Sequence, residues 1–363
     1  MKKSLIALAA LSATAAFAQS SVTIGGQLDA GIQSQKLGNG QTVTTLGSGV
    51  HGASRVWFTG TEDLGGGMSA NWRLEMQPSF QNGSTNADLF NRGAWAGLKG
   101  GFGELRLGRQ GTNTIGAVCT IDQMGCYSGF YGGGLLFSGQ GGPGATGSAL
   151  FAANPTRGSV QASSTEGSTG GVDSTRYVKQ ARYTLPTLAA GLTVNAAYAF
   201  GKSNTAAGGT DGDSMGFDVT YANGPLTLVG AYQKADAEAG ADKKGELTTV
   251  GGSYNLGVAS VGLGYQEEKA SGTGVAFTKG ESTGVTVLFP MGATTVYAKY
   301  AEHKYSGGTL GSVTNAKISN IGARYALSKR SLIYVDYVTN GAAVTNNTTA
   351  LKNQASIGLQ HNF

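Results

Sequence analysis

The sequence predicts an all-β fold, a 16-stranded antiparallel transmembrane β-barrel. Three observations predict it. Apolar residues recur with period two along most of the chain, which is the periodicity of a strand with one apolar and one polar face. The connections between these segments alternate between short and long. Charged residues make up only 13% of the chain, whereas there are 61 glycines and only 6 prolines, a composition suited to long strands and tight turns.

The N-terminus has the order of a secretory signal peptide. A basic start (residues 1–3), an apolar run (5–11) and an Ala-Phe-Ala cleavage site (16–18) precede Gln19. The predicted domains are therefore a signal peptide over residues 1–18 and one barrel domain over residues 19–363. After Gln19 no uninterrupted apolar stretch reaches the ~18 residues that a membrane-spanning helix needs, so a helical membrane protein is excluded.

The first and last strands show the alternation clearly. From Val22 to Gln33, Val22, Ile24 and Ile32 share one face while Asp29 and Gln33 share the other. At the C-terminus, Ile357, Leu359 and Phe363 oppose Ser356, Gln360 and Asn362. Between these ends lie fourteen further predicted strands, near residues 54–63, 68–80, 91–99, 103–110, 174–186, 191–201, 213–223, 225–236, 245–256, 258–270, 279–290, 293–306, 315–328 and 331–340.

The connections separate into two kinds. Turns such as residues 65–67, 100–101, 223–225 and 291–292 are short, and the connections between them are longer and rich in Gly, Asn, Thr and Ser. Short turns at one end and long loops at the other are typical of an outer-membrane barrel. Strands of about ten residues, tilted, also match the apolar thickness of a membrane.

A soluble β-sandwich is the alternative that shares the alternation. Tyrosines near the ends of the apolar faces favour the membrane barrel, where they would form aromatic girdles at the two interfaces: Tyr177, Tyr183, Tyr198, Tyr221, Tyr232, Tyr254 and Tyr265. In hydrocarbon every strand edge must be paired, so the first and last strands are expected to pair and close the sheet. With sixteen strands and polar residues inside, the lumen is expected to hold water.

The charge balance gives no sign of a nucleic-acid partner. Without Lys2 and Lys3 the chain has 24 basic and 21 acidic residues, a net charge of +3. No run of consecutive Lys or Arg forms a basic patch. The sequence therefore predicts no nucleic-acid binding.

One connection is much longer than the others. Strand alternation stops after Arg109, and residues 111–173 form the third long loop, dominated by Gly, Ser and Thr. A loop of this length is usually functional or disordered. Cys119 and Cys126, the only cysteines, both lie in it. An exported pair of cysteines favours a disulfide, free thiols being the alternative, and two thiols alone do not make a zinc site.

Several motifs resemble one known family. Residues 54–67 closely resemble the S-R-x-x-x-x-G-T-E-D-L-G-G-G turn region of the Gram-negative trimeric porins, especially the anion-selective porins of β-proteobacteria. Residues 97–109 are similar to that family's hairpin between the fourth and fifth strands, and residues 327–330 to a late periplasmic turn. Phe363 matches the closing aromatic residue that the family uses as a barrel-assembly signal.

The resemblance implies an outer-membrane general diffusion porin, which passes small hydrophilic solutes through a water-filled channel and favours anions. It implies that residues 111–173 fold into the lumen as a constriction loop, and that the chain forms a homotrimer in contact with outer-membrane lipid and lipopolysaccharide. Arginines of the inner wall then face acidic groups at the constriction. Carried over by position, the arginines are Arg55, Arg92 and Arg176, and the acids are Glu75 and Asp122.

Strand parity supports part of this assignment independently. Arg55 opposes the lipid-type residues Val56 and Phe58, and Arg73 and Glu75 oppose Leu74 on the next strand. Arg106 alternates with two leucines, and by counting residues Arg182 shares a face with Arg176. Arg73 departs from the family that the motifs resemble, in which this position carries an apolar residue. We therefore expect Arg73 and Arg106 to complete the basic wall.

Three other functions fit the sequence less well. An outer-membrane barrel enzyme needs a nucleophile beside an oriented base, and His51, His303 and His361 lie in no catalytic motif, so no catalytic residue, metal or cofactor is predicted. A channel specific for organic acids or similar metabolites would arrange aromatic or charged side chains in a track, for which Trp57 and Tyr297 have suitable parity. A receptor or adhesin barrel would conduct no ions.

Overall fold

The computed structural model describes residues 21–85, 89–124, 176–200, 213–236, 244–273, 278–308, 313–341 and 351–363. The predicted signal peptide lies outside the described residues, and so does the third loop after Met124. In the described part of the chain, no helix is long and apolar enough to cross a membrane.

Sixteen strands form a closed antiparallel barrel and a seventeenth, β2, extends its rim. The elements are β1 (Ser21–Leu37), β2 (Thr42–Ser48), β3 (Arg55–Gly65), β4 (Met68–Met76), β5 (Gly93–Gly100), β6 (Gly103–Gly111), α2 (Asn113–Ile121), β7 (Arg176–Thr184), β8 (Leu192–Ala199), β9 (Ser214–Asn223), β10 (Leu226–Asp236), β11 (Lys244–Asn255), β12 (Ser260–Ser271), β13 (Lys279–Met291), β14 (Thr294–Ser306), β15 (Val313–Ala326), β16 (Ser331–Gly341) and β17 (Leu351–Asn362).

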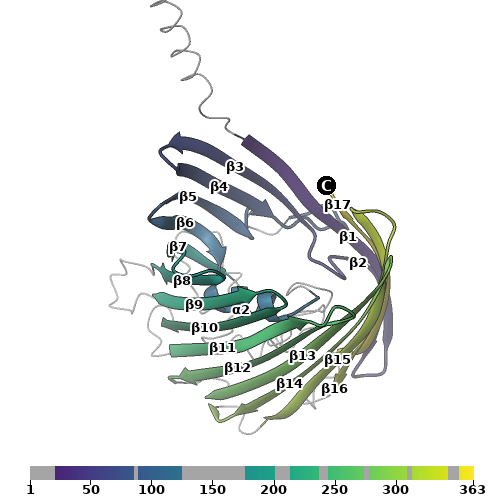
Figure 1. The fold of residues 1–363 in the computed structure, drawn as a ribbon. Helices are drawn as coiled ribbons and strands as arrows, with labels where there is room; N and C mark the ends of the chain where they lie inside the picture. The colour runs from purple at the N-terminus through teal and green to yellow at the C-terminus, as the bar shows by residue number, and fades with distance from the viewer. Residues whose placement is uncertain are drawn as a thin grey trace, which may run out of the picture.

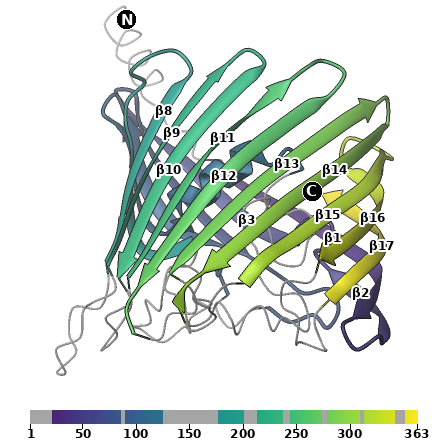
Figure 2. The same cartoon turned by 90° about the horizontal axis from the view of Figure 1, so that it is seen from below.

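The ring closes through β1, as predicted. Its first half (Ser21–Gln27) pairs with β3, and its second half (Gln27–Leu37) pairs with β17. From β3 to β17 each strand pairs antiparallel with the next, and Figure 2 shows the later strands side by side in a tilted wall. The strand β2 pairs with β1 between Thr42 and Ser48, beyond the β1–β3 pairing, so it lengthens the barrel wall at the loop end. The sequence prediction had placed this hairpin inside the first loop.

The two faces of the wall have opposite chemistry. On β17, Ile357 and Leu359 are exposed on the outside, whereas Gln354, Ser356 and Gln360 are buried inside. Large apolar side chains outside and polar ones inside reverse the usual arrangement of a soluble protein and suit a hydrocarbon surround. Tyr221 and Tyr254 are exposed as a girdle requires, but Tyr177 is 5% exposed and therefore does not belong to the outer face.

A short helix in the third loop was not predicted. The helix α2 begins after Thr112, whose side chain accepts a hydrogen bond from the backbone N–H of Ile115, a standard helix cap. Figure 1 shows α2 inside the ring of strands, and it packs against β9, β10 and β11. The described start of the third loop therefore lies within the barrel.

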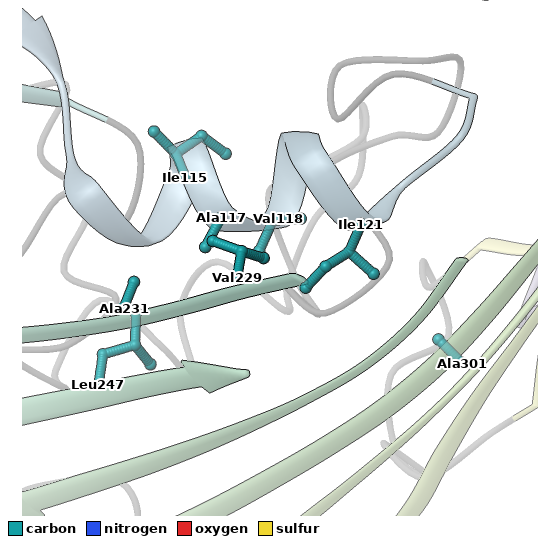
Figure 3. Close-up of a cluster of buried hydrophobic side chains, with 8 residues drawn as sticks. All are labelled: Ile115, Ala117, Val118, Ile121, Val229, Ala231, Leu247 and Ala301. Carbon is teal, nitrogen blue, oxygen red and sulfur yellow. The ribbon is translucent and has the colours of Figure 1, made fainter. Parts of the chain in front are cut away.

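Apolar packing holds α2 against the inner wall (Figure 3). Val118 and Ile121 of the helix are fully buried, and they belong to one cluster with Val229 and Leu247 from β10 and β11. These wall residues have the inward parity of Gln233 and Thr249, so the inner face is apolar where the helix covers it and polar beyond. Full burial of each such side chain contributes about 1.5–3 kcal/mol.

Candidate pore constriction

Three predicted arginines lie at the N-terminal ends of strands β3, β5 and β7. The strands β3, β5 and β7 run in the same direction, so their first residues lie at the same, long-loop end of the barrel. Arg55 and Arg176 are the first residues of β3 and β7, and Arg92 directly precedes β5. Antiparallel topology thus brings residues far apart in sequence to one level of the wall.

Glu75 joins two of these arginines. Its Oε1 lies 2.7 Å from Nε of Arg92, and its Oε2 lies 2.7 Å from Nη2 and 2.8 Å from Nε of Arg73. Arg92, only 6% exposed, also donates from Nη1 to Gln77 at 2.8 Å. Because one carboxylate serves two guanidinium groups, this cluster retains an excess positive charge.

The other predicted arginines lie beside this cluster. Arg176 donates from Nε to the backbone carbonyl of Arg92 at 2.8 Å. Arg55, two strands away on β3, donates from Nη2 to Gln27 of β1 at 3.3 Å, and Gln27 is on the inner face. The structure therefore brings Arg92 and Arg176 into contact and places Arg55 on the adjoining part of the wall.

Arg176 and Arg182 do not share a face of β7, contrary to the prediction from residue counting. The β6–β7 register shifts between Gly108 and Gln110, and Lys179 has a positive φ of 50°, so alternation is interrupted in β7. The buried residues Tyr177 and Gln180 consequently lie three apart, and Arg176 does not share its parity with Arg182. A bulge of this kind redirects side chains and is invisible to a residue count.

A second charged group lies deeper in the lumen. Arg106 forms an ion pair with Glu104 at 2.8 Å, and Arg182 forms one with Asp218 at 3.1 Å. Asp218 also accepts hydrogen bonds from Asn195 on β8 and from Asn113 at the start of α2. Glu104, Asp218 and Asn113 were not predicted as site residues, although the alternation along β6 and β9 places both acids on the inner face.

Asp122 lies on another part of the wall from these arginines. It follows α2, is 2% exposed, and accepts from Lys299 Nζ of β14 at 2.7 Å. The next residue, Gln123, donates its backbone N–H to Thr286 of β13. Asp122 and Lys299 therefore anchor the end of the helix and neutralise each other. Lys299 was not predicted as a site residue, although it lies on the same inward face of β14 as Tyr297.

The remaining predicted sites are partly described. Cys119 of α2 is disulfide-bonded, and Cys126 lies outside the described residues. Phe363 exchanges two backbone hydrogen bonds with Gly26 of β1, at 3.0 and 3.1 Å. In the described residues no group of three or more His, Cys, Asp or Glu side chains is placed to hold a metal ion.

His51 belongs to a buried polar cluster that fixes the end of the first loop. Its Nδ1 lies 3.3 Å from both Asp336 and the hydroxyl of Tyr297, and its ring stacks on Tyr334. Asp29 accepts hydrogen bonds from three successive backbone N–H groups, those of residues 50–52. These contacts hold the segment after β2 against the inside of the barrel.

Comparison with known proteins identifies the family. The profile of the Gram-negative porins matches residues 4–363. The chain belongs to the Gram-negative porin family. Outer membrane porin protein 32 of Delftia acidovorans is 34% identical over 274 residues, which cover 74% of this porin and 70% of that protein. Major outer membrane protein P.IB of Neisseria meningitidis is 43% identical over 114 residues, 30% of this porin and 34% of the relative.

Solved structures agree with the fold. An anion-selective porin from Comamonas acidovorans matches with a TM-score of 0.75 and 25% identity, over 95% of this porin and all of that chain. OmpT of Vibrio cholerae matches with a TM-score of 0.64 over 95% and 98% of the two chains, and at 14% identity it shows the fold alone. With the closed barrel, these findings place the protein in the outer membrane as a porin, as predicted.

Proposed function

We propose that this porin is a general diffusion channel that passes small hydrophilic solutes and favours anions. The observation that carries the proposal is the charge of one side of the inner wall. The described strands place three carboxylates (Glu75, Glu104 and Asp218) against five arginines, listed here from β3 to β7: Arg55, Arg73, Arg92, Arg106 and Arg182.

An arginine excess of this kind acts on every ion that passes. Guanidinium groups stay charged at all working pH values. In a confined lumen with low-dielectric walls their field is screened less than in bulk water, so anions are concentrated and cations are depleted. On the rest of the inner wall Asp122 is neutralised by Lys299, whereas Asp29 and Asp336 are buried in the His51 cluster and Glu268 is buried on β12, so the arginine excess belongs to the side of the wall formed by β3 to β7.

We assign the constriction to Arg55 and Arg92 with Glu75, with Arg176 beside them through its hydrogen bond to the backbone of Arg92, and to the inward third loop that begins with α2. Their shared level at the loop end of the wall and the position of α2 inside the ring support this assignment. Asp122 contributes by anchoring the loop. The Comamonas acidovorans porin with the same fold is anion-selective, which agrees with the expected preference.

Ion selectivity in planar bilayers tests the proposal. The protein in detergent is inserted into a lipid bilayer that separates two KCl solutions of tenfold different concentration. We expect a reversal potential of the sign that chloride diffusion produces. A potential of the opposite sign would overturn the charge assignment, and the absence of any conductance would overturn the channel itself.

The outer surface supports the predicted contact with lipid headgroups. At the loop ends of β12, β13 and β14 the outward positions carry ion pairs: Lys269 with Glu267 at 2.7 Å, Lys279 with Glu281 at 3.0 Å and Lys304 with Glu302 at 3.8 Å. Such charges mark the edge of the apolar band, where phosphorylated lipopolysaccharide headgroups lie in an outer leaflet. We infer that these lysines contact lipopolysaccharide.

Two further inferences follow from membership in the family. We infer that the chain assembles as a homotrimer, which the mobility of the unheated protein in SDS electrophoresis and chemical crosslinking would test. We also infer that it transports without catalysing a reaction, since its family consists of channels. Hydrolase activity that persists in the purified protein would contradict this second inference.

A further inference from the structure

Two tryptophans alternate with two arginines across four neighbouring strands of the inner wall. The Cζ atom of Arg73 lies 4.9 Å from the ring centroid of Trp57, and that of Arg106 lies 4.4 Å from the ring centroid of Trp95. Arg73 and Trp95 are register partners on β4 and β5, which joins the two stacked pairs. We call Trp57, Arg73, Trp95 and Arg106 the Trp–Arg row.

The wall leaves room for these flat side chains to lie along it. Gly25 is the register partner of Trp57, and a Cβ atom there would lie 2.7 Å from the indole ring. Gly97 is the register partner of Arg106, and a Cβ atom there would lie 3.0 Å from Cγ of the arginine. A larger residue at Gly25 would displace the indole of Trp57, whereas one at Gly97 would place its Cβ atom 2.6 Å from the backbone oxygen of Leu105 and would crowd the base of the Arg106 side chain.

Carboxylates fix the orientation of both guanidinium groups. Glu75 Oε2 accepts from Nε and Nη2 of Arg73, and Glu104 Oε2 accepts from Nη2 of Arg106. Because Nε and Nη2 of Arg73 face Glu75, its Nη1 lies on the opposite edge of the planar group. The arginine side chains nevertheless remain 28% and 35% exposed, and on the inner face of a closed barrel that exposure is to the lumen.

We propose that the Trp–Arg row is a binding track for planar aromatic carboxylates, an inference that rests on the proposed channel function. A flat ring stacks on the open face of a guanidinium group or on an indole, because both surfaces are planar and polarisable. The carboxylate of a ring stacked on Trp95 pairs with Arg73, the register partner of Trp95 on the neighbouring strand. Neighbouring strands are about 4.8 Å apart, so adjacent members of the row lie within the length of one such solute.

Benzoate and cyclohexanecarboxylate test the track because they carry the same charge on rings of equal carbon number, one planar and one puckered. Each is added to one side of a bilayer that contains single channels, and the concentration that halves the KCl current is measured. We expect benzoate to block at a concentration about twofold to tenfold lower than cyclohexanecarboxylate, the range that aromatic stacking supplies. Equal block by the two anions would overturn the track.

Variants assign the effect to the row. The chain has three tryptophans, and the third, Trp72, has the outward parity of Leu74, so Trp72→Leu is a matched control. We expect the ratio of the two blocking concentrations to approach one in the double variant Trp57→Leu/Trp95→Leu and to persist in Trp72→Leu. A ratio that persists in the double variant would assign the block elsewhere and overturn the proposal.

Charge-conserving variants provide a second measurement in case the double variant does not insert. Arg73→Lys and Arg106→Lys keep the positive charge but remove the planar group, so the benzoate preference should fall towards one in each. Preference retained in both would refute the stacking role. If the unmutated protein conducts anions but shows no preference for benzoate, the binding track is refuted and the channel function stands. If the protein conducts no ions, the proposed channel function itself is refuted.

Discussion

Neutralising Glu75 should make the pore more selective for anions. In the substitution Glu75→Gln the side chain keeps its shape, and the cluster with Arg73 and Arg92 changes from a net charge of +1 to +2, because this carboxylate lies 2.7 Å from both guanidinium groups. The amide oxygen still accepts a hydrogen bond from one of them. The barrel therefore has no steric reason to change.

The size of the effect follows from one uncompensated charge. At ~10 Å, the screening length in 0.1 M salt, a unit charge changes the energy of a passing ion by about 0.4 kcal/mol in a medium with the dielectric constant of water. The anion is stabilised and the cation destabilised by the same amount. The anion-to-cation permeability ratio should therefore rise about fourfold without screening, or about twofold with it.

Reversal potentials in a KCl gradient measure this ratio. Glu302→Gln is the control, since it makes the same chemical change on the outer face of β14, beside Lys304. We expect little change from the control. A ratio in Glu75→Gln that stays constant or falls, or an equal rise in the control, would refute the charged-wall account.

Three further results are expected. Lys299→Met or Asp122→Asn leaves a buried charge unpaired at the end of α2 and should destabilise the protein by roughly 3–5 kcal/mol, with partial recovery in the double variant, as measured by thermal unfolding in detergent; a loss in the double variant equal to the sum of the two single losses would show that the pair is not coupled. Thiol titration of the unfolded, unreduced protein should find no reactive group, because Cys119 is disulfide-bonded and Cys126 is the only other cysteine of the sequence; two reactive groups would rule the bridge out. Deleting Phe363 removes its two hydrogen bonds with Gly26 and should lower the fraction of assembled barrel, judged by its heat-modifiable mobility; an unchanged fraction would contradict a role in closure.

The strands could be predicted because one face of each strand contacts hydrocarbon and the other faces the aqueous lumen. Hydrocarbon outside and water inside impose a two-residue period along the whole strand, so the sequence revealed all sixteen barrel strands and the inward parity of Arg55, Arg73, Glu75 and Arg106. The hairpin strand β2 was missed because its seven residues lie within a loop and pair only with β1 in the described structure.

The helix α2 and its contacts depend on tertiary structure. The segment N-T-I-G-A-V-C-T-I contains Gly and several β-branched residues, which are weak helix formers, so packing against Val229 and Leu247 rather than local propensity stabilises it. The ion pair of Asp122 with Lys299 joins residues 177 apart in sequence, and no local pattern reports such a distance. The bulge in β7 likewise escaped a residue count.

The junction between β1 and β17 has a consequence for biogenesis. The residues that complete the cylinder, such as Asp29 and Gln360, are separated by more than three hundred positions, so the junction cannot form until the C-terminus has been synthesised and exported. Before then the free edges of β1 and β17 carry backbone N–H and C=O groups without hydrogen-bond partners. Such edges can pair with other chains, and their burial in hydrocarbon is energetically costly. Contacts of such high sequence separation also form slowly. Shielding of these edges in the periplasm therefore favours closure of the barrel over aggregation.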